Sequence, residues 1–292
     1  MELLFCLRNP SLIKKVENKV DGVIVGSLFA MGYSYSLNDI KQICHYCLTH
    51  NLKAYIVMDS FINEDEIQNL YDYLKFLSTL NISGIYFHDL AVMNLAKEFN
   101  LTSKLIYDGY SVMCNSFDAA YYLSKGLNSI VISRELTMQE VVNIVSVNKG
   151  RIDMQIFGHL RMSYSKRKFI KNYFKQINTD YNYQNKQSLY LIEEKRNYKM
   201  PIVEDQYGTR IYSDFVFEMF NELPYLYDYL NRGIVDPLFI NEDYIEDILR
   251  ELGRLTKDNS NFLKNSIRQK YPDNYSTGYL YQKTNLVKDE QD

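Results

Sequence analysis

The sequence predicts a TIM-like (β/α)8 barrel, an α/β fold, on three observations. Up to about residue 157, short apolar runs alternate with stretches of helical periodicity, in units of roughly 20–30 residues. Such repeats indicate parallel strands covered by helices. The chain has 292 residues, enough for one large barrel or for two smaller domains. An open doubly wound sheet is the alternative, but it would normally have a glycine-rich phosphate loop after its first strand, and Cys6–Asn9 is not one.

The repeats assign most elements of the first half. Strands are expected at Glu2–Cys6, Gly22–Gly26, Tyr55–Met58, Gly84–Phe87, Leu105–Tyr107, Ser129–Ile132 and Ile152–Phe157. Helices are expected at Leu12–Val20, Leu37–His50, Glu64–Leu80, Leu90–Phe99, Ser116–Lys125 and Thr137–Val147. Ser36 is a suitable cap for the second helix, and Thr137 with Glu140 forms a capping-box pattern at the start of the sixth.

The second half is less regular. An eighth strand is needed to close the barrel and is expected near Pro201–Glu204 or Arg210–Ser213, so the barrel is expected to be irregular there. Residues 178–199 are polar without clear periodicity, and Leu223–Leu230 and Tyr244–Leu252 are expected to form the last two helices. We therefore expect a barrel domain over residues 1–255 and a polar, flexible C-terminal tail over residues 256–292.

Composition excludes several classes of protein. Hydrophobic residues make up 46% of the chain, which is enough for a substantial core and too many for a disordered protein. No apolar run reaches the roughly 18 residues of a membrane span, and the N-terminus lacks the pattern of a signal peptide. The four cysteines are too sparse for a disulfide framework, so a cytoplasmic location is expected. Because the net charge is −3, any nucleic-acid binding must come from a local basic patch.

The stretch Ile156–Phe174 combines cations with aromatic rings. The cations are Arg161, Lys166, Arg167, Lys168, Lys171 and, just beyond the stretch, Lys175; the rings are Tyr164, Phe169, Tyr173 and Phe174. Cations suit phosphates and rings suit bases, so the pattern fits a phosphate-bearing or nucleic-acid partner. A solvated turn and amphipathic helix is the alternative, and composition alone favours it, because charge runs usually lie on the surface.

The barrel prediction places function at the C-terminal ends of the strands. The polar residues expected there are Asp59, His88, Asp89, Asp108, Asn115, Arg134 and Glu135, followed by the basic stretch. Arg134 and Glu135 fit a polar pocket and a salt-bridged helix start equally well. Cys44 and Cys47 have redox or zinc spacing, but they fall on the apolar face of a predicted helix and are assigned to the core.

No complete catalytic set is visible in the sequence. Ser165 lies in the cationic stretch without an assigned base, so capping or anion contact suits it better than nucleophilic attack. The segment Glu204–Gly208 has a turn-forming glycine after two carboxylates and is interpreted as a turn, or at best a weak cation site. His88 and His159 follow or end strands and could be acid–base groups, although a supporting role is the commoner one.

Three motifs in a fixed order resemble one known family. They are Ser133–Leu136 (SREL), the GHLRMSYSKR run that begins at Gly158 and leads into KNYF, and the EDxxGT run at Glu204–Thr209. The chain, over about Glu2–Leu252, resembles peptidase family U32, and in particular its short members, which are commonly labelled collagenase-like proteases. The resemblance implies a TIM-like barrel and a historical assignment as a hydrolase. It also implies relatives that hydroxylate RNA or ubiquinone precursors, among them a pair of paralogues, one short and one long, that make 5-hydroxyuridine at the tRNA wobble position with prephenate.

The resemblance also implies site residues. Carried over, the candidate catalytic residues are Arg134, Glu135, Ser165 and Arg167. Of the candidate substrate-binding residues, the resemblance gives Asn115, Asn172, Tyr173, Glu204 and Asp205, and the cationic stretch adds Arg161, Lys166 and Lys168. Redox-active relatives hold an iron–sulfur cluster with cysteines at two positions that are Arg161 and Lys168 here. Cationic side chains bind no metal, so no cluster and no metal site are expected in this chain.

The predicted function is therefore that of a cluster-free subunit in tRNA modification. It would help to hold tRNA or pair with the longer U32 paralogue that performs the redox chemistry, with no membrane association. Two alternatives stay open: a peptidase, which would need an activated nucleophile or a metal-bound water, and a non-catalytic scaffold for the paralogue.

Overall fold

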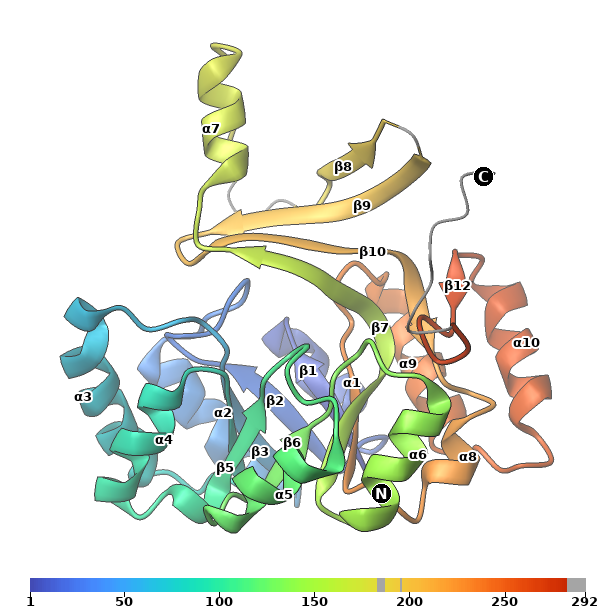
Figure 1. The fold of residues 1–292 in the computed structure, drawn as a ribbon, viewed down its shortest axis with the longest axis horizontal. Coiled ribbons are helices and arrows are strands. Elements are labelled where there is room, and N and C mark those ends of the chain that lie inside the picture. Colours follow the sequence, from blue (N-terminus) through green and yellow to red (C-terminus); the bar gives the residue numbers. More distant parts are fainter. Residues whose placement is uncertain (183–186, 195, 283–292) are drawn as a thin grey trace.

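Eight parallel strands close into a barrel in the computed structural model, which describes residues 1–182, 187–194 and 196–282 (Figure 1). The strands are β1 (Glu2–Leu7), β2 (Gly22–Gly26), β3 (Lys53–Met58), β4 (Gly84–Phe87), β5 (Leu105–Asp108), β6 (Ser129–Val131), β7 (Ile152–Ser165) and β11 (Arg232–Val235). Each strand pairs in parallel with the next, and β11 joins β7 to β1. The predicted TIM-like barrel is confirmed.

The position predicted for the closing strand is wrong. Closure is made by β11, whereas Pro201–Glu204 and Arg210–Ser213 lie in strands outside the barrel. The sequence of β11, RGIV, is short and begins with a buried arginine, so it does not resemble a buried apolar strand. Arg232 is stabilised inside the barrel by Asp153, with 3.0 Å between Nη1 and Oδ2.

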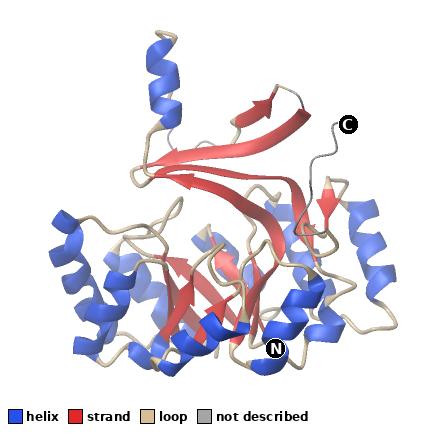
Figure 2. Cartoon of the chain, viewed as in Figure 1, coloured by secondary structure: helices blue, strands red, loops and turns tan. Residues whose placement is uncertain are grey.

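Helices cover the outside of the barrel (Figure 2). They are α1 (Ile13–Val16), α2 (Leu37–Thr49), α3 (Ile67–Ser78), α4 (Leu90–Ala96), α5 (Ser116–Ser124), α6 (Met138–Val147), α8 (Leu223–Leu226) and α9 (Glu242–Leu252), with short 3-10 turns at Pro10–Leu12, Glu64–Glu66, Lys97–Phe99 and Thr102–Lys104. The expected caps at Ser36 and Thr137 are present as capping boxes. Alternate strand residues face inward and outward: Leu4 and Ile24 belong to the barrel interior, whereas Phe5 and Val23 pack against the helices.

An antiparallel extension projects from the C-terminal end of the barrel (Figure 1). Strand β7 continues beyond the barrel and pairs with β10 (Gly208–Glu218), β10 pairs with β9 (Arg196–Asp205), and β9 pairs with β8 (Tyr190–Glu193). Helix α7 (Phe169–Gln176) stands at the far end of β7. We call the described residues of 161–212 the arm. The stretch Ile156–Phe174 is therefore the end of a long strand followed by a helix. The region 178–199, whose sequence has no clear periodicity, contains β8 and the start of β9.

The expected C-terminal tail is folded as far as the structure describes it. Residues 257–282 contain α10 (Ser260–Lys270) and β12 (Tyr275–Ser276), and β12 pairs with β10. Leu263, Ile267 and Leu280 are buried in the core. The expectation of a flexible tail is wrong for this part, because a narrow apolar stripe on α10 is enough to hold it; residues 283–292 lie outside the described residues. No helix in the described part of the chain is both long enough and apolar enough to cross a membrane.

Candidate functional site

The C-terminal ends of the barrel strands bring charged residues together under the arm. Arg8 follows β1, Asp59 follows β3, Asp108 ends β5, Arg134 follows the end of β6 and Asp236 follows β11. These residues line one cavity of about 80 Å³, together with Arg161, Tyr33, Tyr110, Gln155, His159 and Tyr212. The location is the one at which barrels of this type place their active sites.

Two arginines at this mouth of the barrel, Arg8 and Arg134, each form a bidentate ion pair with a carboxylate. Arg8 donates from Nε and Nη2 to the two carboxylate oxygens of Asp236, at 2.6 and 2.7 Å. Arg134 donates from Nη1 and Nη2 to Asp108, at 3.0 and 2.9 Å, and from Nε to Gln155. Burial would raise the pKa of Asp108 and Asp236, but the neighbouring guanidinium groups hold the pKa of both carboxyl groups below the usual value. These four residues are therefore charged in the folded protein.

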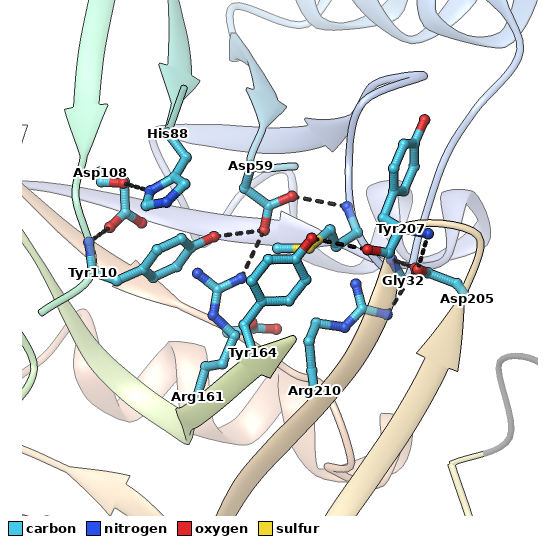
Figure 3. A network of polar contacts seen from close by, with 12 residues as sticks. Gly32, Asp59, His88, Asp108, Tyr110, Arg161, Tyr164, Asp205, Tyr207 and Arg210 are labelled. Atoms are coloured by element: carbon cyan, nitrogen blue, oxygen red, sulfur yellow. Dashed lines mark hydrogen bonds and ion pairs between the residues drawn. The ribbon is translucent and has the colours of Figure 1, made fainter. Parts of the chain in front are cut away.

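Arg161 is held in a different way, from the part of β7 that leaves the barrel (Figure 3). Its Nη1 lies 3.4 Å from Oδ2 of Asp59, and its guanidinium lies 3.0 Å from the centre of the Tyr110 ring. Asp59 also accepts a hydrogen bond from the Tyr110 hydroxyl, at 2.9 Å, and one from the backbone N–H of Met31, at 2.8 Å. Asp59 is thus shared among three donors.

A second set of contacts fastens the arm over the barrel (Figure 3). Asp205, at the β9–β10 turn, accepts from Nη2 of Arg210 at 2.7 Å and from the backbone N–H of Gly32 at 2.6 Å. The Tyr207 hydroxyl donates to the carbonyl of Leu28, and the Tyr164 hydroxyl donates to the carbonyl of Tyr207. The arm is therefore tied to the loop after β2, directly above the charged mouth.

A second cavity of about 300 Å³ adjoins the first. It shares Tyr110, Arg134 and Arg161 with the first cavity, and Glu135 is on its wall. Aromatic rings form much of the rest: Phe61 stacks on Tyr164 with 5.3 Å between ring centres, and His88 packs against both Phe61 and Tyr110. A lining of both polar groups and aromatic rings suits a small ligand with an apolar body.

The structure brings some of the sequence-predicted residues together at the mouth. Arg134, Glu135 and Arg161 line the cavities. Asp205 fastens the arm, as described above. Lys168 donates from Nζ to the carbonyl of Asp205, so it also belongs to this fastening.

Other predicted residues have local structural contacts. Glu204 is buried and accepts from the backbone N–H groups of Ile170 and Lys171, at the start of α7. Asn115 is the N-cap of α5. The Ser165 hydroxyl accepts from the backbone N–H of Arg167, which is a capping contact. Exposed on the arm are Lys166, whose Nζ contacts Asn63, together with Arg167, Asn172 and Tyr173.

Several mouth residues were not predicted from the sequence. Arg8, Tyr110, Arg210, Tyr212 and Asp236 line or cover the site. Arg8 and Tyr110 follow β1 and β5, which the sequence made visible, whereas Asp236 follows β11 and the other two belong to β10. A charged residue directly after a predicted strand would have been the signal for Arg8. The distinguishing feature of Tyr110 is its left-handed backbone, with φ of 56°, which only a structure reveals.

Thiol chemistry does not fit this site. Cys6 lines the first cavity, but burial and the nearby Asp236 raise the pKa of its thiol, which is the opposite of an activated nucleophile. Burial also raises the pKa of Cys44 to about 11 and of Cys47 to about 12, and both side chains pack in the core. Among the described residues, no group of three or more His, Cys, Asp or Glu side chains is placed to hold a metal ion.

The residues at the positions of the relatives' cluster ligands do not fit an iron–sulfur cluster either. Arg161 is paired with Asp59, and Lys168 is bonded to the carbonyl of Asp205. Neither side chain can supply a thiolate, and both bring positive charge where a cluster needs negative ligands.

A parallel barrel whose polar groups gather at the C-terminal strand ends defines a TIM-barrel-like protein with a candidate site at its mouth. The chain belongs to peptidase family U32, whose family model matches residues 11–288. It is 29% identical to tRNA hydroxylation protein P2 of Bacillus subtilis over 197 residues. The matched segment covers 66% of this chain and 64% of that protein. The chain is 20% identical to tRNA hydroxylation protein P1 of the same organism over 157 residues. This segment covers 52% of this chain and 37% of that protein.

A third relative is described as a protease. An uncharacterized protease of Methanocaldococcus jannaschii is 24% identical over 277 residues, which covers 88% of this chain and 66% of that protein. In all three comparisons the match spans less than two thirds of the relative's own length.

Proposed function

We propose that this chain is a subunit of a tRNA-hydroxylating system, which binds tRNA through its arm and acts together with a longer U32 paralogue. The proposal is supported by its similarity to tRNA hydroxylation proteins P2 and P1, and by family membership. The proposed reaction is the prephenate-dependent 5-hydroxylation of the wobble uridine, in the cytoplasm.

One structural observation carries the proposal: the arm projects from the mouth end of the barrel (Figure 1), and its helix α7 carries exposed cations and rings. Arg167, Lys171 and Lys175 are exposed on or next to α7. Phe169 and Tyr173 are exposed in the same segment, and the Tyr173 side chain is 58% accessible. Large exposed rings among cations suit RNA, because the cations contact phosphates and the rings can stack on bases. The arm would thus hold tRNA directly above the mouth.

The positive charge of Arg161 and Lys168 decides which step we assign to each of the two proteins. The resemblance to redox-active members of the family implies that Arg161 and Lys168 stand at the positions of their cluster cysteines, so we assign the redox step to the longer paralogue. This chain would contribute the RNA-binding arm and the charged mouth. A peptidase role has less support, because the thiol in the cavity has a raised pKa and the Ser165 hydroxyl caps a turn.

Binding of tRNA to the purified chain tests the arm. The variant Arg167→Ala/Lys171→Ala/Lys175→Ala should bind roughly tenfold or more weakly at low salt. The slope of log K against log salt concentration should decrease in magnitude by about 2 to 3, because each lost phosphate contact contributes about 0.7–0.9. The control Lys14→Ala/Lys15→Ala/Lys41→Ala removes the same charge from exposed positions on the barrel flank. Equal affinity of the two variants would contradict the proposal.

Measurement in cells tests the reaction. Deleting the gene should lower the content of 5-hydroxyuridine derivatives in bulk tRNA, measured by mass spectrometry in a strain without a second supply pathway. The native gene and the flank control should restore the content, and the arm variant should not. An undiminished content after deletion would overturn the function, whereas restoration by the arm variant would overturn the role of the arm alone.

A further inference from the structure

The three arginines of the first cavity differ in how well their charge is compensated. Arg8 and Arg134 each face a carboxylate through two hydrogen bonds, and these carboxylates raise the pKa of both guanidinium groups although burial acts against them. Arg161 shows the opposite direction: burial lowers its pKa, and Asp59 offsets only part of that effect. A buried cation with too little opposing charge is costly unless an anion joins it.

The hydrogen bonds of Arg161 also compensate its charge incompletely. Its side chain is only 9% exposed, and its contact with Asp59, at 3.4 Å, is long for a charge-assisted bond. Asp59 is also occupied by Tyr110 and by the backbone of Met31. The Nη2 group of Arg161 is buried and has no hydrogen-bond partner within the described part of the chain. An unsatisfied buried donor of this kind is rare in folded proteins.

A second unsatisfied donor belongs to the same cavity. Nη1 of Arg8 is also buried without a partner among the described residues, because Arg8 uses Nε and Nη2 for Asp236. Arg8 and Arg161 both line the cavity, and so does Tyr212. Two guanidinium groups that line the same cavity, from residues far apart in the sequence, thus each have an unpartnered N–H group.

We infer that the barrel mouth of this chain is an oxyanion site, in which Arg161 and Arg8 bind a carboxylate or phosphate group of a small molecule. A single oxyanion has enough lone pairs to accept from both free N–H groups, and its charge balances Arg161. Arg134, which is already paired with Asp108, forms part of the wall. The adjoining cavity shares Arg134, Arg161 and Tyr110, so the body of a larger ligand would extend toward Phe61 and Tyr164. The inference does not depend on RNA binding by the arm.

Anion binding to the whole chain, without RNA, tests the site. Malonate and inorganic phosphate serve as the carboxylate and phosphate probes, each titrated against chloride at constant ionic strength and followed by calorimetry. We expect saturable binding of at least one probe, and its identity distinguishes a carboxylate site from a phosphate site. Arg161→Gln should bind that probe at least tenfold more weakly, whereas Arg254→Gln, an exposed arginine just after α9, should bind it as the native chain does. Binding of neither probe, or equal binding by Arg161→Gln, would overturn the inference.

A measurement on the native chain removes the dependence on a variant that could misfold. With arginine labelled with ¹⁵N, the Nε–H signals of Arg8 and Arg161 should shift together during the titration, and that of the exposed Arg250 should stay in place. Shifts of all arginine signals in proportion to anion concentration would indicate nonspecific screening and would overturn the site. Because no RNA is present, failure here leaves the tRNA-binding result of the arm unaffected.

Discussion

Arg8 and Asp236 lie 228 residues apart in the chain and form an ion pair through two hydrogen bonds, of 2.6 and 2.7 Å. Arg8 directly follows β1 and Asp236 directly follows β11, the two strands whose parallel pairing closes the barrel. The guanidinium of Arg8 also stacks on Tyr33, 4.3 Å from the ring centre. The ion pair therefore holds the seam of the barrel at the end where the candidate site lies.

Removing one member of this pair should destabilise the protein strongly. Asp236→Leu leaves Arg8 with an uncompensated charge in a mostly buried position, so we expect the free energy of unfolding to fall by about 3–5 kcal/mol. Urea denaturation monitored by circular dichroism measures the loss. The double variant Arg8→Met/Asp236→Leu should recover much of it, because an apolar pair replaces both charges. If the loss measured for Arg8→Met alone and the loss for Asp236→Leu simply add in the double variant, the two side chains do not act as a pair.

Glu204 should stabilise α7 from outside the helix. Residue Lys168, at the N-cap position, makes no side-chain capping bond, and Glu204 instead accepts from the N–H groups of Ile170 and Lys171 and from the Thr209 hydroxyl. We expect Glu204→Ala to weaken the helix by about 1–2 kcal/mol, as the loss of a cap does. Hydrogen exchange measured by mass spectrometry should speed up over Phe169–Gln176 and stay unchanged in the barrel strands.

The variant Glu204→Gln is the matched control, since it keeps one acceptor oxygen and should give an intermediate exchange rate. Glu204→Ala should also weaken tRNA binding, although Glu204 is buried, because the cations of α7 lose their fixed position. Unchanged protection of α7 in Glu204→Ala would show that the helix does not depend on this carboxylate.

The extent to which the fold could be predicted depends on where each strand lies. Strands β2 and β4 are buried on both faces, so GVIVG and GIYF stand out as apolar runs. The arm strands break this link between apolar sequence and burial: β10 is largely buried although it contains Arg210, and in β8 the apolar residues Tyr190, Leu191 and Ile192 are exposed. Strand β11 was missed because Arg232 occupies an interior position that the partner Asp153 makes possible.

Whether a site residue could be predicted likewise depends on whether the strand before it could be recognised in the sequence. Asp59, Asp108 and Arg134 were expected at the mouth because each ends or follows a strand that the sequence made visible. Asp236 follows β11, which was not recognised, and Arg210 reaches the site from the arm. The EDxxGT run was interpreted as a turn. It does form one, but Glu204 and Asp205 also brace α7 and the loop after β2, and these contacts are with residues distant in the sequence.

Gly158 should be intolerant of any side chain. It lies where β7 leaves its parallel partner β11 and continues beside β10, with φ of +114°. A Cβ there would lie 2.1 Å from the carbonyl oxygen of Asp236, which is backbone and cannot move aside. Gly158→Ala should therefore lower the free energy of unfolding by more than the roughly 1–2 kcal/mol that a left-handed alanine costs.

The control for Gly158 is Gly150→Ala. Gly150 also has positive φ, +70°, but a Cβ there would meet no atom within 4 Å. The two variants share the backbone cost and differ in crowding, so urea denaturation of both isolates the contact with Asp236. Equal losses would mean that the strand crossing at Gly158 can widen without cost.

His159 should make stability depend on pH. Its Nδ1 donates to the carbonyl of Ser213 at 2.7 Å, and burial lowers its pKa below the usual value of 6.5, although Asp273, Asp236 and Asp214 oppose that effect. The unfolded chain therefore takes up a proton at His159 at a higher pH than the folded chain does. The stability contributed by the neutral ring is fully present above about pH 6.5 and is lost as the pH falls below it.

Urea denaturation at pH 7.5, 6.5 and 5.5 should show a smaller fall in the free energy of unfolding for His159→Gln than for the native chain. His45→Gln, at an exposed position on α2, is the control and should follow the native chain. The same slope for His159→Gln and the native chain would assign the acid sensitivity to other groups.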